Sequence, residues 1–372
     1  MLINKVDDLL ARHAAFWHCR AVERPLVGVT RWSQFNLSQF DWGLPDEEGI
    51  LRPEMLDVDH FLPQYEALFG DGGPFDDDLC WSAMPPKAIP WLEGALGCPI
   101  EYSLRAGSIS ARPILGDGPL ELVPAPLADN SWFAKLLEFV HGLARLADGR
   151  FAVGLPLTRG PWDLVAALCG SSSLYLGLYD RPDELARLAG VCADFWIEAN
   201  NHLSSAIPKW QGGNVAFLGI WAPTFDPMSQ DDASASISQE FYRRIMGAAD
   251  QRTARAWDSA IFHVHSAGLQ ITNEVLEWLD GRALNITLDP SGPPLDAILP
   301  ILRGVQERRI PLHVLTADPA QARLLVEVLS PSGLAIMYQA IDPTAERDAN
   351  SGFRVPRSLP AQARSTTIRA EP

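Results

Sequence analysis

The sequence predicts an α/β protein folded as a (β/α)8 barrel, and three observations lead to this prediction. The chain has 372 residues, enough for one large barrel. Short apolar runs alternate with helical stretches from residue 151 onward. The competing architecture is a doubly wound open sheet, but no glycine-rich phosphate loop follows the first predicted strand. The barrel is therefore favoured.

The second half of the chain contains six predicted strands in regular order. They lie at residues 151–155, 214–220, 260–265, 283–289, 311–316 and 334–339. The helices between them begin near residues 161, 182, 238, 269, 294 and 318. Asp318 can cap the last of these helices, with Pro319 as its first residue. Because each connection contains a helix, the strands should be parallel.

The first half has a less regular pattern. An N-terminal helical extension precedes a strand at 25–30, and a strand at 99–104 brings the expected total to eight. Residues 33–98 are rich in Pro, Gly and Asp and predict a long insertion after the first strand. This insertion should form a lid or wall at the C-terminal face of the barrel.

Residues 1–345 are expected to form a single domain. The polar segment 346–372 is expected to be a disordered tail.

Composition excludes several classes of protein. The chain has 30 basic and 46 acidic residues and a formal net charge of −16, which disfavours binding to nucleic acid. No apolar run approaches the roughly 20 residues of a membrane helix, and the N-terminus does not have the pattern of a signal peptide. The five cysteines lack CxxC spacing, which argues against a disulfide framework or a thiolate zinc site. A cytoplasmic protein is expected.

The strongest candidates for chemistry are two histidines on one strand. In the run 260–265, Phe262 and Val264 share the face that should meet the outer helices. His263 and His265 share the opposite face because side chains alternate along a strand. Both should therefore project into the mouth of the barrel, where barrel enzymes have their active sites.

The next strand carries polar residues on the same inward face. Asn285, Thr287 and Asp289 alternate with outward Ile286 and Leu288. Asp289 is the best acidic candidate. It could instead cap a helix or orient a histidine. His263, His265 and Asp289 could together bind zinc or another divalent ion.

Other residues at the predicted mouth could bind substrate. We expect Arg31 and Trp32 after the first strand, Trp221 after the run 214–220, and Gln339 at the end of the last strand. Arg159 could form a bidentate pair with a carboxylate, as could Arg105 and Arg112 in neighbouring loops. At least one of these three arginines, and Arg31, should face the cavity. Nothing in the sequence has the pattern of a nucleophile elbow.

Four stretches carry a family resemblance that extends over about residues 20 to 345. They are IPWLEGALGCPIEYS (89–103), LPLTRGPWDLVAALCGSSSLYLGLYDRPDEL (155–185), FHVHSAG (262–268) and LSPSGLAIMYQAIDPTAE (329–346). In their order and spacing the chain resembles the uroporphyrinogen decarboxylase superfamily, which also includes cobalamin-dependent methyltransferases. The resemblance implies the barrel fold.

The departures from the family motifs concern function. The decarboxylases have an arginine-rich segment after the first strand, of which this chain keeps only Arg31. Asp78 is the nearest match to their key aspartate, and Tyr338 stands where they have a histidine. The zinc methyltransferases use His-x-Cys and a later Cys. Here His263 matches the first ligand, His265 replaces the cysteine, and no cysteine follows position 192.

Three functions therefore compete. The first is a decarboxylase that acts on a carboxylated, aromatic or pyrrole-like small molecule without an organic cofactor. Its proton transfer and charge stabilisation would involve His263, His265 and Asp289, with Tyr338 and Asp78 as further candidates. The classical heme-pathway substrate is disfavoured.

The second function is a corrinoid-dependent methyltransferase with a separate corrinoid protein docked over the mouth. The third is a barrel that binds a ligand without catalysis. The expected partners are a small-molecule substrate, the corrinoid protein in the second case, and a second copy of the chain in a homodimer. Neither nucleic acid nor a membrane is expected.

Overall fold

The centre of the computed structural model is a six-stranded parallel sheet with the order β1-β13-β12-β11-β10-β9. The structure describes residues 2–30, 40–45, 48–70, 77–215 and 217–339. The strands of the sheet are β1 (Leu26–Thr30), β9 (Met228–Gln230), β10 (Ile261–His265), β11 (Ala283–Leu288), β12 (Leu312–Thr316) and β13 (Leu334–Gln339). The sheet and the surrounding helices confirm the predicted α/β class.

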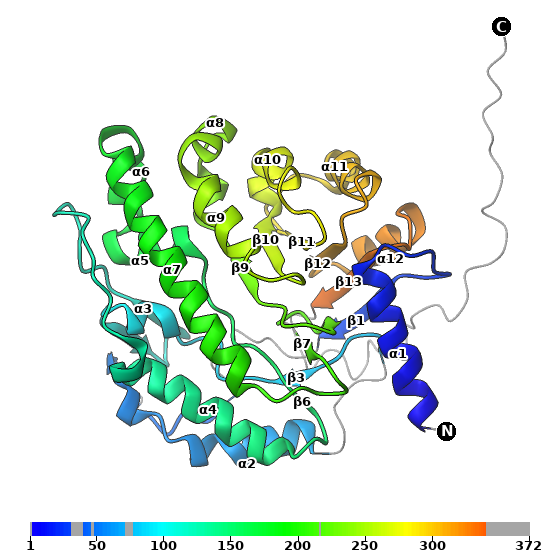
Figure 1. Cartoon of the computed structure of the whole chain (residues 1–372), viewed down its shortest axis with the longest axis horizontal. Helices are drawn as coiled ribbons and strands as arrows, with labels where there is room; N and C mark the ends of the chain where they lie inside the picture. Colours follow the sequence, from blue (N-terminus) through cyan, green and yellow to red (C-terminus); the bar gives the residue numbers. More distant parts are fainter. Residues whose placement is uncertain (1, 31–39, 46–47, 71–76, 216, 340–372) are drawn as a thin grey trace, which may run out of the picture.

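Helices cover the outer face of this sheet (Figure 1). They include α9 (Gly247–Ala254), α10 (Thr272–Leu276), α11 (Leu295–Glu307) and α12 (Pro319–Val328). Beyond the β9 edge lie α5 (Pro161–Cys169), α6 (Ser171–Asp180) and α7 (Pro182–Ala206), and the short α8 (Gln239–Phe241) precedes α9. Phe262, Val264 and Ile286 are fully buried in the cluster that includes the helices. Ile261 and Ala283, at the alternate positions, belong to a separate inner cluster. The predicted alternation of outward and inward side chains along β10 and β11 is confirmed.

Two further strands form a separate parallel pair. β3 (Ser82–Ala83) pairs with β6 (Ala152–Val153). After β6, the Gly160 N–H donates to the Gln230 carbonyl over 2.9 Å, and before β3 the Asp78 N–H donates to the Val27 carbonyl over 3.0 Å. The described residues thus contain eight parallel strands in two ladders. These ladders do not close into one ring. The structure therefore confirms a parallel α/β fold, and it does not confirm the predicted closed barrel.

Two predicted strands lie outside the parallel ladders. The run 99–104 forms β4 (Ile100–Ser103), which pairs antiparallel with β2 (Gly49–Leu51) and β5 (Ser108–Ala111). The run 214–220 was also misassigned. It holds only β7 (Asn214–Val215), which forms a hairpin with β8 (Trp221–Ala222), because Gly219 turns the chain with a φ of 72°. The strand next to β10 is β9 instead.

The segment expected as an insertion is partly integrated into the fold. It supplies β3, and its helix α2 (Val58–Phe69) packs against α4 (Ser131–Ala147). The short helix α3 (Trp91–Ala95) follows. The tail 346–372 lies outside the described residues. Within the described chain, no helix is long and apolar enough to span a bilayer.

The predicted N-terminal helix is α1 (Leu2–Trp17), and its His13 joins two distant parts of the chain. Its Nε2–H donates to the Asp78 carbonyl over 2.8 Å, and its Nδ1 accepts the Trp221 N–H over 3.0 Å. Both ring nitrogens are used by the neutral imidazole, and burial lowers the pKa of His13 to about 4. A proton on Nδ1 would remove the acceptor for Trp221.

We expect acid to destabilise the protein through His13. The unfolded chain binds a proton at this residue below about pH 6.5, whereas the folded chain does so only near pH 4. The unfolded state therefore gains protons first, and His13 alone should lower the free energy of unfolding by roughly 2 kcal/mol between pH 7 and pH 5. Urea denaturation of the wild type and of His13→Gln at both pH values measures this. The variant should lose correspondingly less stability on acidification, and the exposed-site control His18→Gln should behave like the wild type. Equal losses in all three proteins would contradict the assignment.

Candidate functional site

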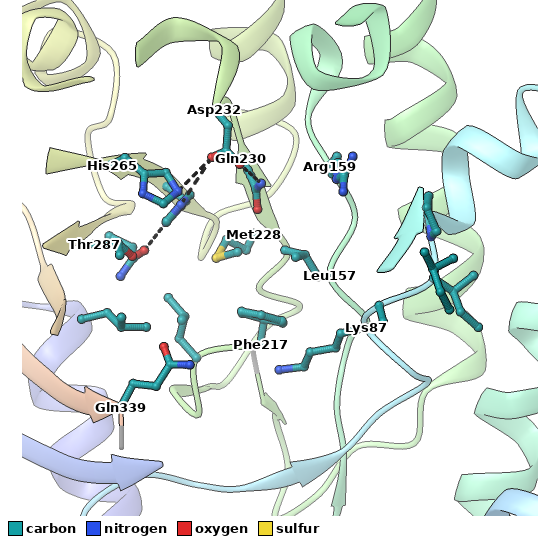
Figure 2. A pocket seen from close by; sticks show the side chains of 18 of the residues that line it. Lys87, Leu157, Arg159, Phe217, Met228, Gln230, Asp232, His265, Thr287 and Gln339 are labelled. Atoms are coloured by element: carbon teal, nitrogen blue, oxygen red, sulfur yellow. Dashed lines mark hydrogen bonds and ion pairs between the residues drawn. The ribbon is translucent and has the colours of Figure 1, made fainter. Parts of the chain in front are cut away.

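A cavity of about 420 Å³ opens at the carboxyl ends of the parallel strands (Figure 2). Its sheet side is lined by Met228, Gln230, Asp232, His263, His265, Asn285, Thr287, Leu315 and Gln339. The opposite walls come from residues before and within α3, from the β4–β5 turn, and from Leu157 and Arg159. Part of the segment 33–98 therefore borders the mouth.

A chain of polar side chains crosses three neighbouring strands, beginning at the cavity with His263 and Asn285 and ending at His313, which is fully buried behind it. The strand register places His263 of β10 beside Asn285 of β11, and Asn285 beside His313 of β12. The Asn285 amide joins the two rings. Its Oδ1 accepts from Nδ1 of His263, and its Nδ2 donates to Nδ1 of His313 over 2.6 Å. His263 must therefore carry a proton on Nδ1, which leaves Nε2 without one in the neutral ring.

His265 lies one layer nearer to the mouth and is oriented by Asp289. The distance from its Nδ1 to Asp289 Oδ1 is 2.6 Å. Asp289 is itself fixed, because its Oδ2 accepts from the Ser266 hydroxyl over 2.9 Å and from the Ala267 N–H over 3.3 Å. Asp289 thus lies within hydrogen-bonding reach of a histidine, as expected from the sequence.

Asp232 completes the site, and sequence analysis missed it. It follows β9, and its Oδ1 lies 3.3 Å from Nε2 of His265 and 3.7 Å from Nε2 of His263. Gln230 donates to its other oxygen over 2.6 Å. Figure 2 shows Asp232 and His265 directed toward each other at one end of the cavity. The sequence pattern predicts the neighbouring strand at 214–220, whereas β9 lies next to β10 and places Asp232 at the site.

The charges of these groups depend on one another. The contact with Asp232 raises the pKa of His265 to about 9 despite burial, and Asp289 adds to this effect. Burial alone would raise the pKa of Asp232, but the hydrogen bond with His265 and both nearby histidines hold it below its ordinary value. Burial lowers the pKa of His263, so this ring is neutral at pH 7.

The donor atoms of Asp232, His263 and His265 fit a divalent metal ion. All three lie within 4.8 Å of one another. Ligands about 2.0–2.1 Å from a tetrahedral ion lie about 3.3 Å apart, close to the observed separations from Asp232. Both Nδ1 atoms are held by other groups, as is usual for metal-binding histidines. The predicted third ligand, Asp289, is instead the partner that orients His265.

The opposite wall carries two cations. Arg159 lines the cavity, and its Nη1 lies 3.3 Å from Oε1 of buried Glu93. Lys87 also lines the cavity, with its Nζ 3.4 Å from the centre of the Phe217 ring. Sequence analysis predicted Arg159 here but not Lys87.

The other predicted residues are dispersed. Gln339 lines the cavity as expected, whereas Tyr338 alternates with it and packs against the outer core. Asp78 is not among the lining residues and forms ion pairs with Arg12 and Arg24. Trp221 is buried, and its indole N–H donates to the Trp210 carbonyl.

Of the predicted arginines, only Arg159 is seen at the cavity. Arg105 is exposed and does not line it, and Arg112 pairs with Glu101 on the surface. Arg31 and Trp32 lie outside the described residues.

Comparison with known proteins gives a likeness in fold. No family model and no curated protein matches the chain. Thirteen chains of solved structures do. Among them is a methyltransferase from Methanosarcina mazei, with a TM-score of 0.62 and 16% sequence identity over 92% of this chain and 99% of the other. At this identity the likeness shows a shared fold alone.

We expect Asn285→Leu to destabilise the protein by roughly 2 to 4 kcal/mol, because it leaves two buried imidazole nitrogens without a partner. Thr287→Val, one layer nearer to the mouth on the same strand face, is the matched control and should cost less than about 1 kcal/mol. Chemical denaturation at pH 7.5 measures both free energies of unfolding. Similar small losses in the two variants would show that the Asn285 bridge contributes little.

Proposed function

We propose that this protein is a metal-dependent methyltransferase whose active site is the cavity at the carboxyl ends of the parallel strands. A divalent ion would be held by Asp232, His263 and His265. When bound, such an ion acts as a Lewis acid that lowers the pKa of a substrate thiol, hydroxyl or amine and so supplies a nucleophile. A separate corrinoid protein that docks over the mouth would bring the methyl group.

The observation that carries this proposal is the convergence of two Nε2 atoms on one carboxylate oxygen. His263 is neutral and carries its proton on Nδ1, so its Nε2 lone pair is directed at the negatively charged Asp232. Two electron-rich atoms at this separation repel each other unless a cation lies between them. A divalent ion would satisfy both atoms and would replace the proton through which Nε2 of His265 contacts Asp232.

Each ligand has a neighbour that fixes its orientation. Asn285 holds the ring of His263, Asp289 holds that of His265, and Gln230 holds the carboxylate of Asp232. Such support reduces the reorganisation needed for a metal to bind. The substrate would enter from the mouth, where Asp232 keeps 45% of its side-chain surface exposed.

Methyl transfer is preferred because the fold is shared with a methyltransferase and the superfamily resemblance includes methyltransferases. A decarboxylase remains a second candidate for one specific reason. Without a metal, His265 lies between two carboxylates, an arrangement suited to a proton donor, and Arg159 lines the same cavity and could bind a carboxylate. Nothing in the comparisons favours this alternative.

Equilibrium dialysis against zinc tests the metal site. We expect the wild type to bind one equivalent per chain. Asp232→Asn should abolish stoichiometric binding, and Asp289→Asn should weaken it by about 10- to 100-fold because it removes only an orienting partner. Asp296→Asn, an exposed aspartate on α11, is the matched control and should bind like the wild type. Equal binding by all four proteins would contradict the assignment.

Demethylation of methylcobalamin tests the activity. The metal-loaded protein is incubated with methylcobalamin and a panel of small thiols, amines and hydroxyl compounds, and the cobalt absorbance is followed. We expect metal-dependent demethylation that Asp232→Asn abolishes and Asp296→Asn retains. Release of carbon dioxide from a carboxylated compound by the metal-free protein, without any demethylation, would contradict methyl transfer and support the second candidate.

A further inference from the structure

Lys87 carries a buried amine at the wall of the cavity, and no ion pair of the described residues involves it. Its residue is 8% exposed, and within the described chain its Nζ has no hydrogen-bond partner. Its one notable neighbour is the face of Phe217, 3.4 Å away. Burial lowers the pKa of Lys87 well below its ordinary value. An unpaired amine in such a place costs stability, so its presence in a cavity wall suggests that a ligand pairs with it.

The two ends of the cavity carry different kinds of side chain. Figure 2 shows Lys87 beside Phe217, away from the end that carries Asp232 and His265. Between them Figure 2 shows the apolar side chains of Leu157 and Met228. The other charged or titratable residues of the lining are Glu93, Arg159, Asp232, His263 and His265. Arg159 has an acidic partner in Glu93, whereas the Lys87 amine has no hydrogen-bond partner among the described residues.

We propose that the substrate is a small monocarboxylate with an apolar middle, whose carboxylate pairs with Lys87 while its reactive end reaches Asp232, His263 and His265. A single lysine balances a single negative charge, which favours a carboxylate over a doubly charged phosphate. The volume of about 420 Å³ suits a small molecule. This inference rests on the proposed function only in taking the cavity as the substrate site.

Pairing of this kind should couple ligand binding to proton uptake. Burial disfavours the charged form of the Lys87 amine and a bound carboxylate favours it, so ligand binding should draw a proton onto the amine, which then donates to the carboxylate. Isothermal titration at pH 8 with hexanoate, in two buffers of different ionisation enthalpy, measures the number of protons taken up. Hexan-1-ol is the matched ligand without a charge and should bind without proton uptake. The protein is used both metal-free and zinc-loaded.

The decisive variant is Lys87→Met, which keeps an unbranched side chain one atom shorter and removes the amine. We expect it to weaken hexanoate binding at least about tenfold, or about 1.4 kcal/mol, and to change hexan-1-ol binding less than about twofold. It should also raise the melting temperature, because it removes an unpaired buried amine. Arg112→Gln removes a surface cation outside the cavity and should leave hexanoate binding unchanged.

Several outcomes would overturn the proposal. In the first, Lys87→Met loses the same affinity for hexanoate as for hexan-1-ol. In the second, the wild type binds hexanoate without proton uptake. In the third, the wild type does not bind hexanoate. Failure of zinc binding in dialysis would instead count against the proposed metal site, since hexanoate binding to Lys87 is also measured in the metal-free protein. The two failures are therefore distinguishable.

Discussion

The Asn285 side chain bridges two imidazole rings, and the geometry of the candidate site depends on this bridge. An amide oxygen can only accept and an amide nitrogen can only donate, so His263 must carry its proton on Nδ1 while His313 presents a lone pair there. Because β10, β11 and β12 are neighbours in register, the three side chains form one layer, of which His263 and Asn285 line the cavity. The bridge leaves Nε2 of His263 facing Asp232.

The fold brings three separate segments to this point. Parallel strands end at the same edge of the sheet, so Asp232 after β9 and Asp289 after β11 flank His265 at the end of β10. The opposite wall comes from the segment before α3, which supplies Lys87. The cavity therefore has one end rich in metal-binding donors and another with the Lys87 amine, which has no hydrogen-bond partner among the described residues.

Strand parity explains what the sequence could predict. Two-residue alternation was enough to place His263, His265 and Asn285 on the inner face and to bring Asp289 near a histidine. The eight strands were less predictable, because β3, β6 and β9 have only two or three residues each and carry no clear alternation. Their assignment depends on pairing with distant strands, which local sequence does not encode.

The strand pattern also explains why some site residues were not predicted. Asp232 was overlooked because the apolar run 214–220 reads as a strand, although Gly219 turns it into a hairpin. His313 lies in a correctly predicted strand, and its inward parity relative to Leu312 and Val314 would have identified it. Lys87 is different, since its burial follows from tertiary packing around Phe217 and the sequence alone gives no sign of it.

X-ray absorption at the zinc edge of the protein loaded with one equivalent of zinc tests the central claim most directly. The account predicts a first shell of only nitrogen and oxygen at about 2.0–2.1 Å, with the outer-shell signature of two imidazoles. All five cysteines are buried, and none lines the cavity. A sulfur ligand at about 2.3 Å, or a shell without imidazole, would show that zinc binds elsewhere and would contradict the site formed by Asp232, His263 and His265.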